Sequence, residues 1–152
     1  MSATERLLAA ARTRAPEQPY AGAVTPDEAY ALLQSDPNVK LIDVRTNAER
    51  DWVGRVSISS AQHAAVEWST WPGGLPNASF AEQLAHVATP DDVLLFLCRS
   101  GVRSRHAARV ATENGYPNAF DILEGFEGDK DGEGHRKTVG GWCKAGLPWM
   151  GA

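Results

Sequence analysis

One stretch of the chain limits its possible folds more than any other: a short apolar run, then a polar loop, then a helical pattern. Val93–Leu97 is five apolar residues in succession, which is short for a helix and typical of a strand buried on both faces. Residues 98–103 follow as Cys-Arg-Ser-Gly-Val-Arg, and apolar residues then recur at helical spacing until a stop at Gly115. The stretch therefore predicts a buried strand, a tight loop and a helix. A cysteine lies at the carboxyl end of that strand, where open α/β sheets bind ligands.

The loop has features that stabilise a negatively charged sulfur. Backbone N–H groups at a helix N-terminus lack intrahelical partners, and together with the helix dipole they favour an anion. Gly101 allows the backbone to curl consecutive N–H groups around one point, and Arg99 and Arg103 add positive charge. Because the thiolate is the nucleophilic form of cysteine, this pattern predicts that Cys98 is a reactive thiol. The alternative is a buried structural cysteine.

Strand and helix patterns alternate along the rest of the chain, which predicts an α/β fold with a mainly parallel sheet. Helices are expected to begin after Ser2, Thr25 and Ser79, because each is followed three positions later by Glu as in a capping box. Further helical segments are expected at 47–52 and after the cysteine loop. Strands are expected at residues 21–24, 39–44, 93–97 and 119–123, with a small strand at 56–58.

Length and composition narrow the class of protein. The 152 residues fit one domain, and we expect residues 1–19 to be a helical extension and linker and residues 20–152 to be the domain. The net charge of −4 argues against nucleic acid or an anionic membrane as a partner. No apolar run approaches the length of a membrane-spanning helix, and the N-terminal residues lack the apolar core of a secretory signal. We therefore expect a cytoplasmic protein.

The cysteines and histidines indicate neither a disulfide framework nor a zinc site. Cys98 and Cys143 are the two cysteines, and the four histidines are scattered through the chain. No metal, flavin or nucleotide cofactor is therefore expected. Cys143 is expected to be a structural thiol, with reaction at Cys98 as the alternative role. Trp68 and Trp71 are expected either to plug the core or to line the approach to the loop.

These motifs resemble the rhodanese (thiosulfate sulfurtransferase) superfamily. Residues 98–103 look like its active-site loop, in which the cysteine carries a persulfide, and 41–45 with Glu49, Trp52 and Gly54 look like its first motif. The chain departs from that motif by reading Gly-Arg-Val where the family has Gly-His-Ile. Residues 123–126 and 141–149 are similar to the closing glycine-rich segment. The resemblance covers about residues 20–150, and it implies a central, mainly parallel sheet flanked by helices on both faces.

The resemblance also implies roles for the residues that match. Cys98 would be the catalytic residue. Asp43 and Arg45 would support the loop, with Arg45 pairing with an acid such as Glu49. Phosphatases of related fold have five residues between the cysteine and the arginine, whereas four separate Cys98 from Arg103, and the shorter loop is similar to the sulfurtransferase branch. The loop residues expected to bind the substrate and the transferred sulfur are Arg99, Ser100, Gly101, Val102 and Arg103.

The sequence thus predicts a sulfurtransferase of the rhodanese type. It would move a sulfane sulfur from a small anionic donor such as thiosulfate to a thiol or cyanide acceptor through a persulfide on Cys98. One alternative is a non-enzymatic module that carries or senses sulfur or binds a partner. Another is a phosphatase or arsenate reductase of related fold. The sequence leaves the oligomeric state open.

Overall fold

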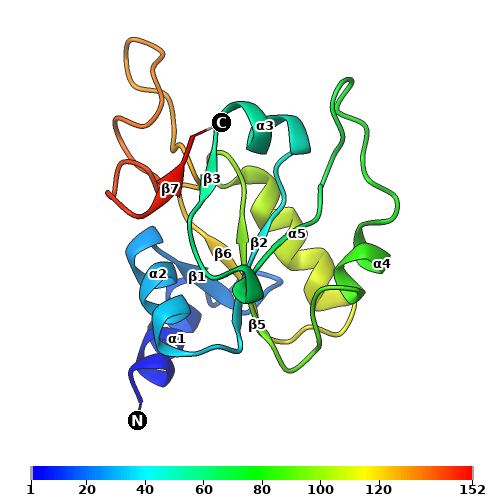
Figure 1. The fold of residues 1–152 in the computed structure, drawn as a ribbon. Helices are drawn as coiled ribbons and strands as arrows, with labels where there is room; N and C mark the ends of the chain where they lie inside the picture. Colours follow the sequence, from blue (N-terminus) through cyan, green and yellow to red (C-terminus); the bar gives the residue numbers. More distant parts are fainter. Residues whose placement is uncertain (1, 152) are drawn as a thin grey trace.

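A five-stranded parallel sheet forms the centre of the computed structural model, which describes residues 2–151. Its strand order is β1-β6-β5-β2-β4, so β5, which precedes the cysteine loop, is the middle strand (Figure 1). A second sheet pairs β3 with β7 in antiparallel orientation. The strands are β1 (Gly22–Val24), β2 (Val39–Asp43), β3 (Arg55–Val56), β4 (His63–Ala65), β5 (Val93–Leu97), β6 (Ala119–Ile122) and β7 (Trp149–Met150).

Helices cover both faces of the parallel sheet, as predicted. In Figure 1, α1 and α2 lie on one side of the sheet and α4 and α5 on the other, while α3 lies beyond the carboxyl ends of the strands. The helices are α1 (Ala3–Arg14), α2 (Pro26–Ser35), α3 (Asn47–Trp52), α4 (Phe80–Ala85) and α5 (Val102–Glu113), with a short 3-10 helix at Ser60–Gln62.

Two apolar cores result from the alternation of side chains along the strands. In β5, Leu94 and Phe96 face the core beneath α4 and α5, whereas Leu95 and Leu97 face the core beneath α1 and α2. All four side chains are fully buried, which explains the uninterrupted apolar run. Burying a side chain of this size stabilises the fold by roughly 1.5–3 kcal/mol. The middle strand is therefore a rigid support for the loop that follows it.

The N-terminal helix contributes to one of these cores. Ala11 of α1 is fully buried, and Gly22 of β1 approaches its carbonyl so closely that a Cβ at that position would collide with it. Arg14 forms an ion pair with Glu28 of α2. The helix is thus packed on the sheet beside α2, and the expected domain boundary near residue 20 stays a prediction.

The expected helix starts are confirmed in all three cases, but the expected capping box is wrong at Ser79. Ser2 and Thr25 both form capping boxes. Ser79 makes no capping hydrogen bond through its side chain, because its backbone is not extended; instead its N–H donates to Oδ1 of Asn77 at 3.0 Å. The small strand expected at 56–58 is shifted to Arg55–Val56, where it pairs with β7.

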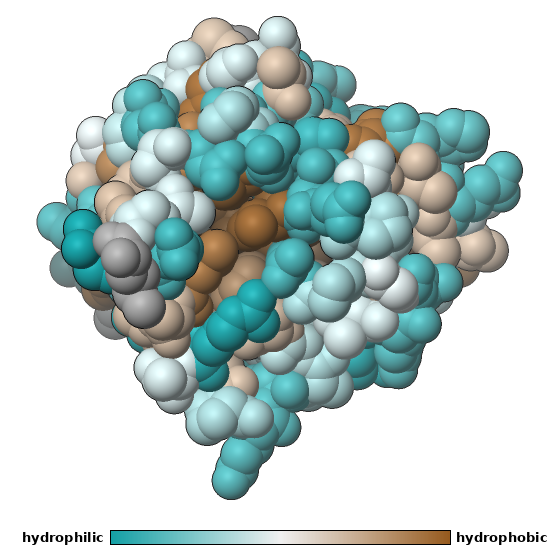
Figure 2. Space-filling view, turned by 90° about the horizontal axis from the view of Figure 1, so that it is seen from below, coloured by the Kyte–Doolittle hydropathy of each residue, from teal (hydrophilic) through white to brown (hydrophobic). Residues whose placement is uncertain are grey.

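The end of the molecule where the parallel strands begin is shown in Figure 2. Apolar residues are visible there in a central recess that is surrounded by hydrophilic side chains. None of the helices within residues 2–151 is long and apolar enough to cross a membrane. The chemistry predicted from the sequence lies at the opposite end, where the strands terminate.

Candidate active site

The Cys98 thiol lies at the base of the loop between β5 and α5. Its Sγ accepts a hydrogen bond from the Gly101 N–H at 3.1 Å and lies 3.3 Å from the Ser104 hydroxyl oxygen. Gly101 has a φ of 110°, a backbone conformation that residues with a Cβ rarely adopt. Cys98 is only 1% exposed. The glycine thus allows the loop to turn an amide toward the sulfur, as the sequence predicted.

A turn that follows β6 supports the loop from behind. The Phe126 N–H donates to the Cys98 carbonyl at 2.8 Å, and the Glu127 N–H donates to the Arg99 carbonyl at 3.0 Å. Gly125, with a φ of 67°, lies so close that an added Cβ would be 2.5 Å from the Arg99 carbonyl carbon. The backbone of the loop is therefore held against a second backbone segment.

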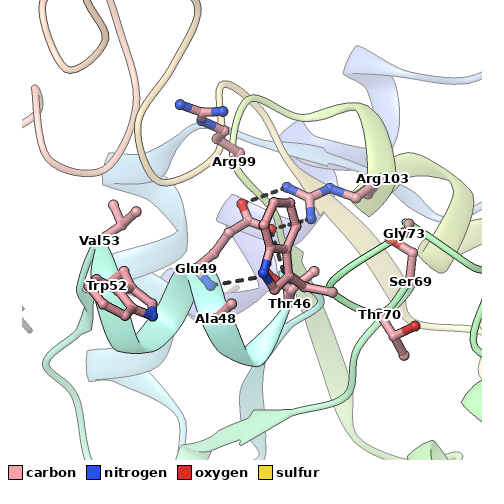
Figure 3. Close-up of a pocket in the computed structure, with 12 residues that line it drawn as sticks. Thr46, Ala48, Glu49, Trp52, Val53, Ser69, Thr70, Gly73, Arg99 and Arg103 are labelled. Carbon is pink, nitrogen blue, oxygen red and sulfur yellow. Dashed lines mark hydrogen bonds and ion pairs between the residues drawn. The ribbon is translucent and has the colours of Figure 1, made fainter.

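Both arginines of the loop are paired with carboxylates. Arg103 donates two hydrogen bonds to Glu49 of α3, at 2.6 and 2.9 Å (Figure 3). Arg99 pairs with Glu127 at 3.1 Å. Burial opposes the charge on Glu49, but the hydrogen bonds from Arg103 and Thr46 outweigh it and lower the pKa of Glu49 to about 2. The two guanidinium groups are thus positioned and partly neutralised, and their contact with a substrate stays a prediction.

Asp43 and Arg45 form a fully buried ion pair beneath the loop. Arg45 Nη2 lies 2.7 Å from Asp43 Oδ2 and also donates to the Gly54 carbonyl. The expected pairing of Arg45 with Glu49 is wrong. Arg45 is buried against Asp43, the last residue of β2, whereas Glu49 pairs with Arg103. The Arg45 guanidinium lies 4.3 Å from the centre of the Phe126 ring, so the pair contacts the turn that supports the loop.

A cleft of about 850 Å³ lies between α3 and the segment 69–74, next to the two arginines. Trp52 and Trp71 line it and are 84% and 71% exposed. Trp68 instead is half-buried and packs edge-on against Phe80 of the core, with ring centres 5.1 Å apart. Trp68 thus packs against the core, whereas Trp71 lines the cleft next to the site.

Cys143 lies in a different environment from Cys98. It packs at the edge of the core beneath α1 and α2, and burial raises the pKa of its thiol to about 11. This environment disfavours the reactive thiolate. Within residues 2–151, no group of three or more His, Cys, Asp or Glu side chains is arranged to hold a metal ion.

Sequence reasoning missed two polar residues that contact the cysteine directly or through one neighbour. Ser104 lies in the first turn of α5, and its hydroxyl is 2.5 Å from Oδ1 of Asp121 in β6. Asp121 is 1% exposed. The available signal was a single acid inside an otherwise apolar strand, at a position where a buried charge needs a specific reason.

Comparison with known proteins identifies the family. Residues 21–152 match the family model described as the STR4 middle domain. The crystal structure of Rv0390 from M. tuberculosis is 43% identical, has a TM-score of 0.78, and the match covers 88% of this chain and 99% of that one.

Two curated relatives are similar over most of their length. The first, Uncharacterized protein RC0915 of Rickettsia conorii, is 32% identical over 126 residues, 81% of this chain and 92% of the relative. The second, Thiosulfate sulfurtransferase GlpE of Haemophilus influenzae, is 30% identical over 125 residues, 82% of this chain and 90% of the relative. The match to the family model, together with these relatives and the parallel sheet, shows that this chain belongs to the rhodanese-like domain proteins.

Proposed function

We propose that the protein transfers a sulfane sulfur through a persulfide on Cys98. The observation that carries the proposal is the position of Sγ, 3.1 Å from the Gly101 amide in a loop that opens directly into α5. An amide and a helix N-terminus stabilise negative charge on sulfur without any other group. The similarity to GlpE, which is named a thiosulfate sulfurtransferase, supports the same chemistry.

The reaction would be a double displacement. The Cys98 thiolate attacks the outer sulfur of a donor such as thiosulfate; a new S–S bond forms, the donor's S–S bond breaks, and sulfite leaves with the electron pair. A thiolate or cyanide acceptor then attacks the terminal sulfur of the persulfide and regenerates the Cys98 thiolate. Electrons balance without an outside oxidant or reductant, and the steps use no cofactor.

The loop residues have separate roles in this scheme. Residues 99–103 surround the transferred sulfur, and the Gly101 N–H donates to the thiolate when it attacks and when it leaves. Arg99 and Arg103 bind the oxygens of an anionic donor with the N–H groups that their carboxylate partners leave free. Asp43 and Arg45 support the loop from below, and we expect this chemistry to take place in the cytoplasm.

The test is formation of thiocyanate from thiosulfate and cyanide. We expect turnover by the native protein and by Cys143→Ser, which removes the cysteine outside the loop, and none by Cys98→Ser. Substantial activity in Cys98→Ser would overturn the assignment. A persulfide that forms without turnover would favour a sulfur carrier, and hydrolysis of p-nitrophenyl phosphate would favour a phosphatase.

A further inference from the structure

A buried chain of three polar side chains starts at the Cys98 sulfur and ends away from the substrate cleft. Cys98 Sγ is 3.3 Å from Ser104 Oγ, and Ser104 Oγ is 2.5 Å from Asp121 Oδ1. The exposed fractions of the three residues are 1%, 0% and 1%. All three side chains are therefore shielded from bulk solvent. The roles proposed above use neither Ser104 nor Asp121.

Asp121 lacks the partners that a buried carboxylate normally has. Its Oδ2 has no hydrogen-bond partner among residues 2–151, and it makes no ion pair within 4.0 Å there. Three titratable groups interact with Asp121. Cys98 is connected to it through the Ser104 hydroxyl, and the other two are Tyr20, from the segment before β1, and Arg105 of α5. Arg105 directs its Nε to the Gly101 carbonyl, so its charge acts on Asp121 only from a distance.

The balance of these effects keeps Asp121 ready to bind a proton. Burial raises the pKa of Asp121 to about 7, against the opposing effects of the Ser104 hydrogen bond and the charge of Arg105. The charge of Arg103 interacts with Cys98 from the other side. The Asp121 carboxylate and the Cys98 thiol are thus connected by one hydroxyl, which both donates and accepts.

We propose that Asp121 is a positioning residue that takes up the thiol proton of Cys98 through the Ser104 hydroxyl, an inference that rests on the function proposed above. The S–H bond breaks and its proton passes to Ser104 Oγ, while the original hydroxyl proton of Ser104 passes to Asp121 Oδ1. The three residues carry one negative charge before and after. The resulting thiolate accepts hydrogen bonds from Ser104 and from the Gly101 N–H.

This relay fits both steps of the transfer. It supplies the thiolate that attacks the donor and keeps the thiol proton within the buried chain. When the acceptor removes the terminal sulfur, the Cys98 thiolate leaves while the Ser104 O–H and the Gly101 N–H donate to it. The stored proton remains on Asp121 and is returned only when a neutral thiol is formed.

The test is the pH dependence of the reaction of Cys98 with iodoacetamide, followed on the Cys98 peptide by mass spectrometry so that Cys143 does not contribute. Two interacting groups lose their protons in two steps, so the native protein is expected to give a two-step rate profile. Asp121→Asn leaves one titrating group and is expected to give a single step. Ser104→Ala is expected to slow the reaction at neutral pH at least tenfold, and Ser104→Thr, which restores a hydroxyl, is expected to recover it.

The matched control is Thr112→Ala, which removes another hydroxyl from α5, one that donates to the Ala108 carbonyl; its profile is expected to equal that of the native protein. Two steps in Asp121→Asn, or an unchanged rate in Ser104→Ala, would overturn the relay. Alkylation needs no sulfur donor, so a confirmed relay in a protein that forms no persulfide would contradict only the proposed function.

A second measurement covers the case in which Asp121→Asn does not fold. The infrared band of a protonated carboxyl group is followed against pH in the native protein and in Cys98→Ser. Sharing of the proton predicts that the band is lost in two steps in the native protein and in one step in Cys98→Ser. A single step in both proteins would overturn the proposal.

Discussion

Two buried aspartates near the carboxyl ends of parallel strands differ in every contact they make. Asp43 has both oxygens in hydrogen bonds to Arg45, and Arg50 lies 3.8 Å away. Asp121 has one oxygen on the Ser104 hydroxyl and no partner for the other within residues 2–151. One carboxylate is compensated by charge, whereas the other is left in an apolar strand.

The difference separates architecture from chemistry. A buried ion pair holds neighbouring segments in place, as Asp43 and Arg45 do for the turn behind the loop. A buried carboxylate without a cation shifts its pKa toward neutrality and can exchange a proton during a reaction. Asp121 belongs to the second class.

The largest effect is expected from breaking the paired site. Arg45→Ala leaves Asp43 as an unpaired charge in the core and removes the cation from the Phe126 ring, so the free energy of unfolding should fall by about 3–5 kcal/mol. Urea denaturation at pH 7 measures this loss. The control is the double variant Arg45→Ala with Asp43→Asn. It also removes the unpaired charge of Asp43 and should recover part of the lost free energy of unfolding. A loss below about 1 kcal/mol in the single variant would contradict a structural role for the pair.

A smaller, pH-dependent effect is expected from Asp121→Asn. Because the folded pKa of about 7 lies above the ordinary value of 3.8, the carboxyl group favours folding fully below pH 3.8, and this contribution is lost as the pH rises through 7. The free energy of unfolding of the variant should therefore equal that of the native protein near pH 4. Near pH 8 it should be higher by a few kcal/mol, since one pKa unit corresponds to about 1.4 kcal/mol. Denaturation curves at the two pH values measure this difference in the free energy of unfolding. A difference that does not change with pH would contradict the distinction between the two aspartates.

The smallest effect is expected at the half-buried pair of Glu49 and Arg103. The folded pKa of about 2 lies below the ordinary value of 4.5, so this carboxylate stabilises the protein above pH 4.5 and loses its contribution as the pH falls toward 2. Glu49→Gln should lower the free energy of unfolding by about 1 kcal/mol at pH 6 and by less at pH 3. This pH dependence is the reverse of the one expected for Asp121→Asn. Thermal unfolding at both pH values provides the comparison. A cost that grows on acidification would contradict the assigned pairing.

The sequence was informative where local chemistry determined the structure. The apolar run of β5, the caps at Ser2 and Thr25 and the glycine of the loop identified the parallel sheet and the position of Cys98. These features depend on residues close together in the chain.

The sequence was less informative about which charged side chain meets which. Glu49 is close to Arg45 in sequence, yet it pairs with Arg103, 54 positions away. Ser104 and Asp121 are 17 positions apart and meet because β6 lies beside β5 in the sheet. Such pairings depend on strand order and burial, which short motifs do not specify.

The most direct test of the central claim is the intact mass of the protein after mixing with thiosulfate, measured beside Cys98→Ser. We predict a gain of one sulfur atom, about 32 Da, that cyanide reverses and that is absent from the variant, because only a thiolate in this loop accepts the sulfur. No gain with thiosulfate or polysulfide, or an equal gain in Cys98→Ser, would contradict persulfide formation at Cys98.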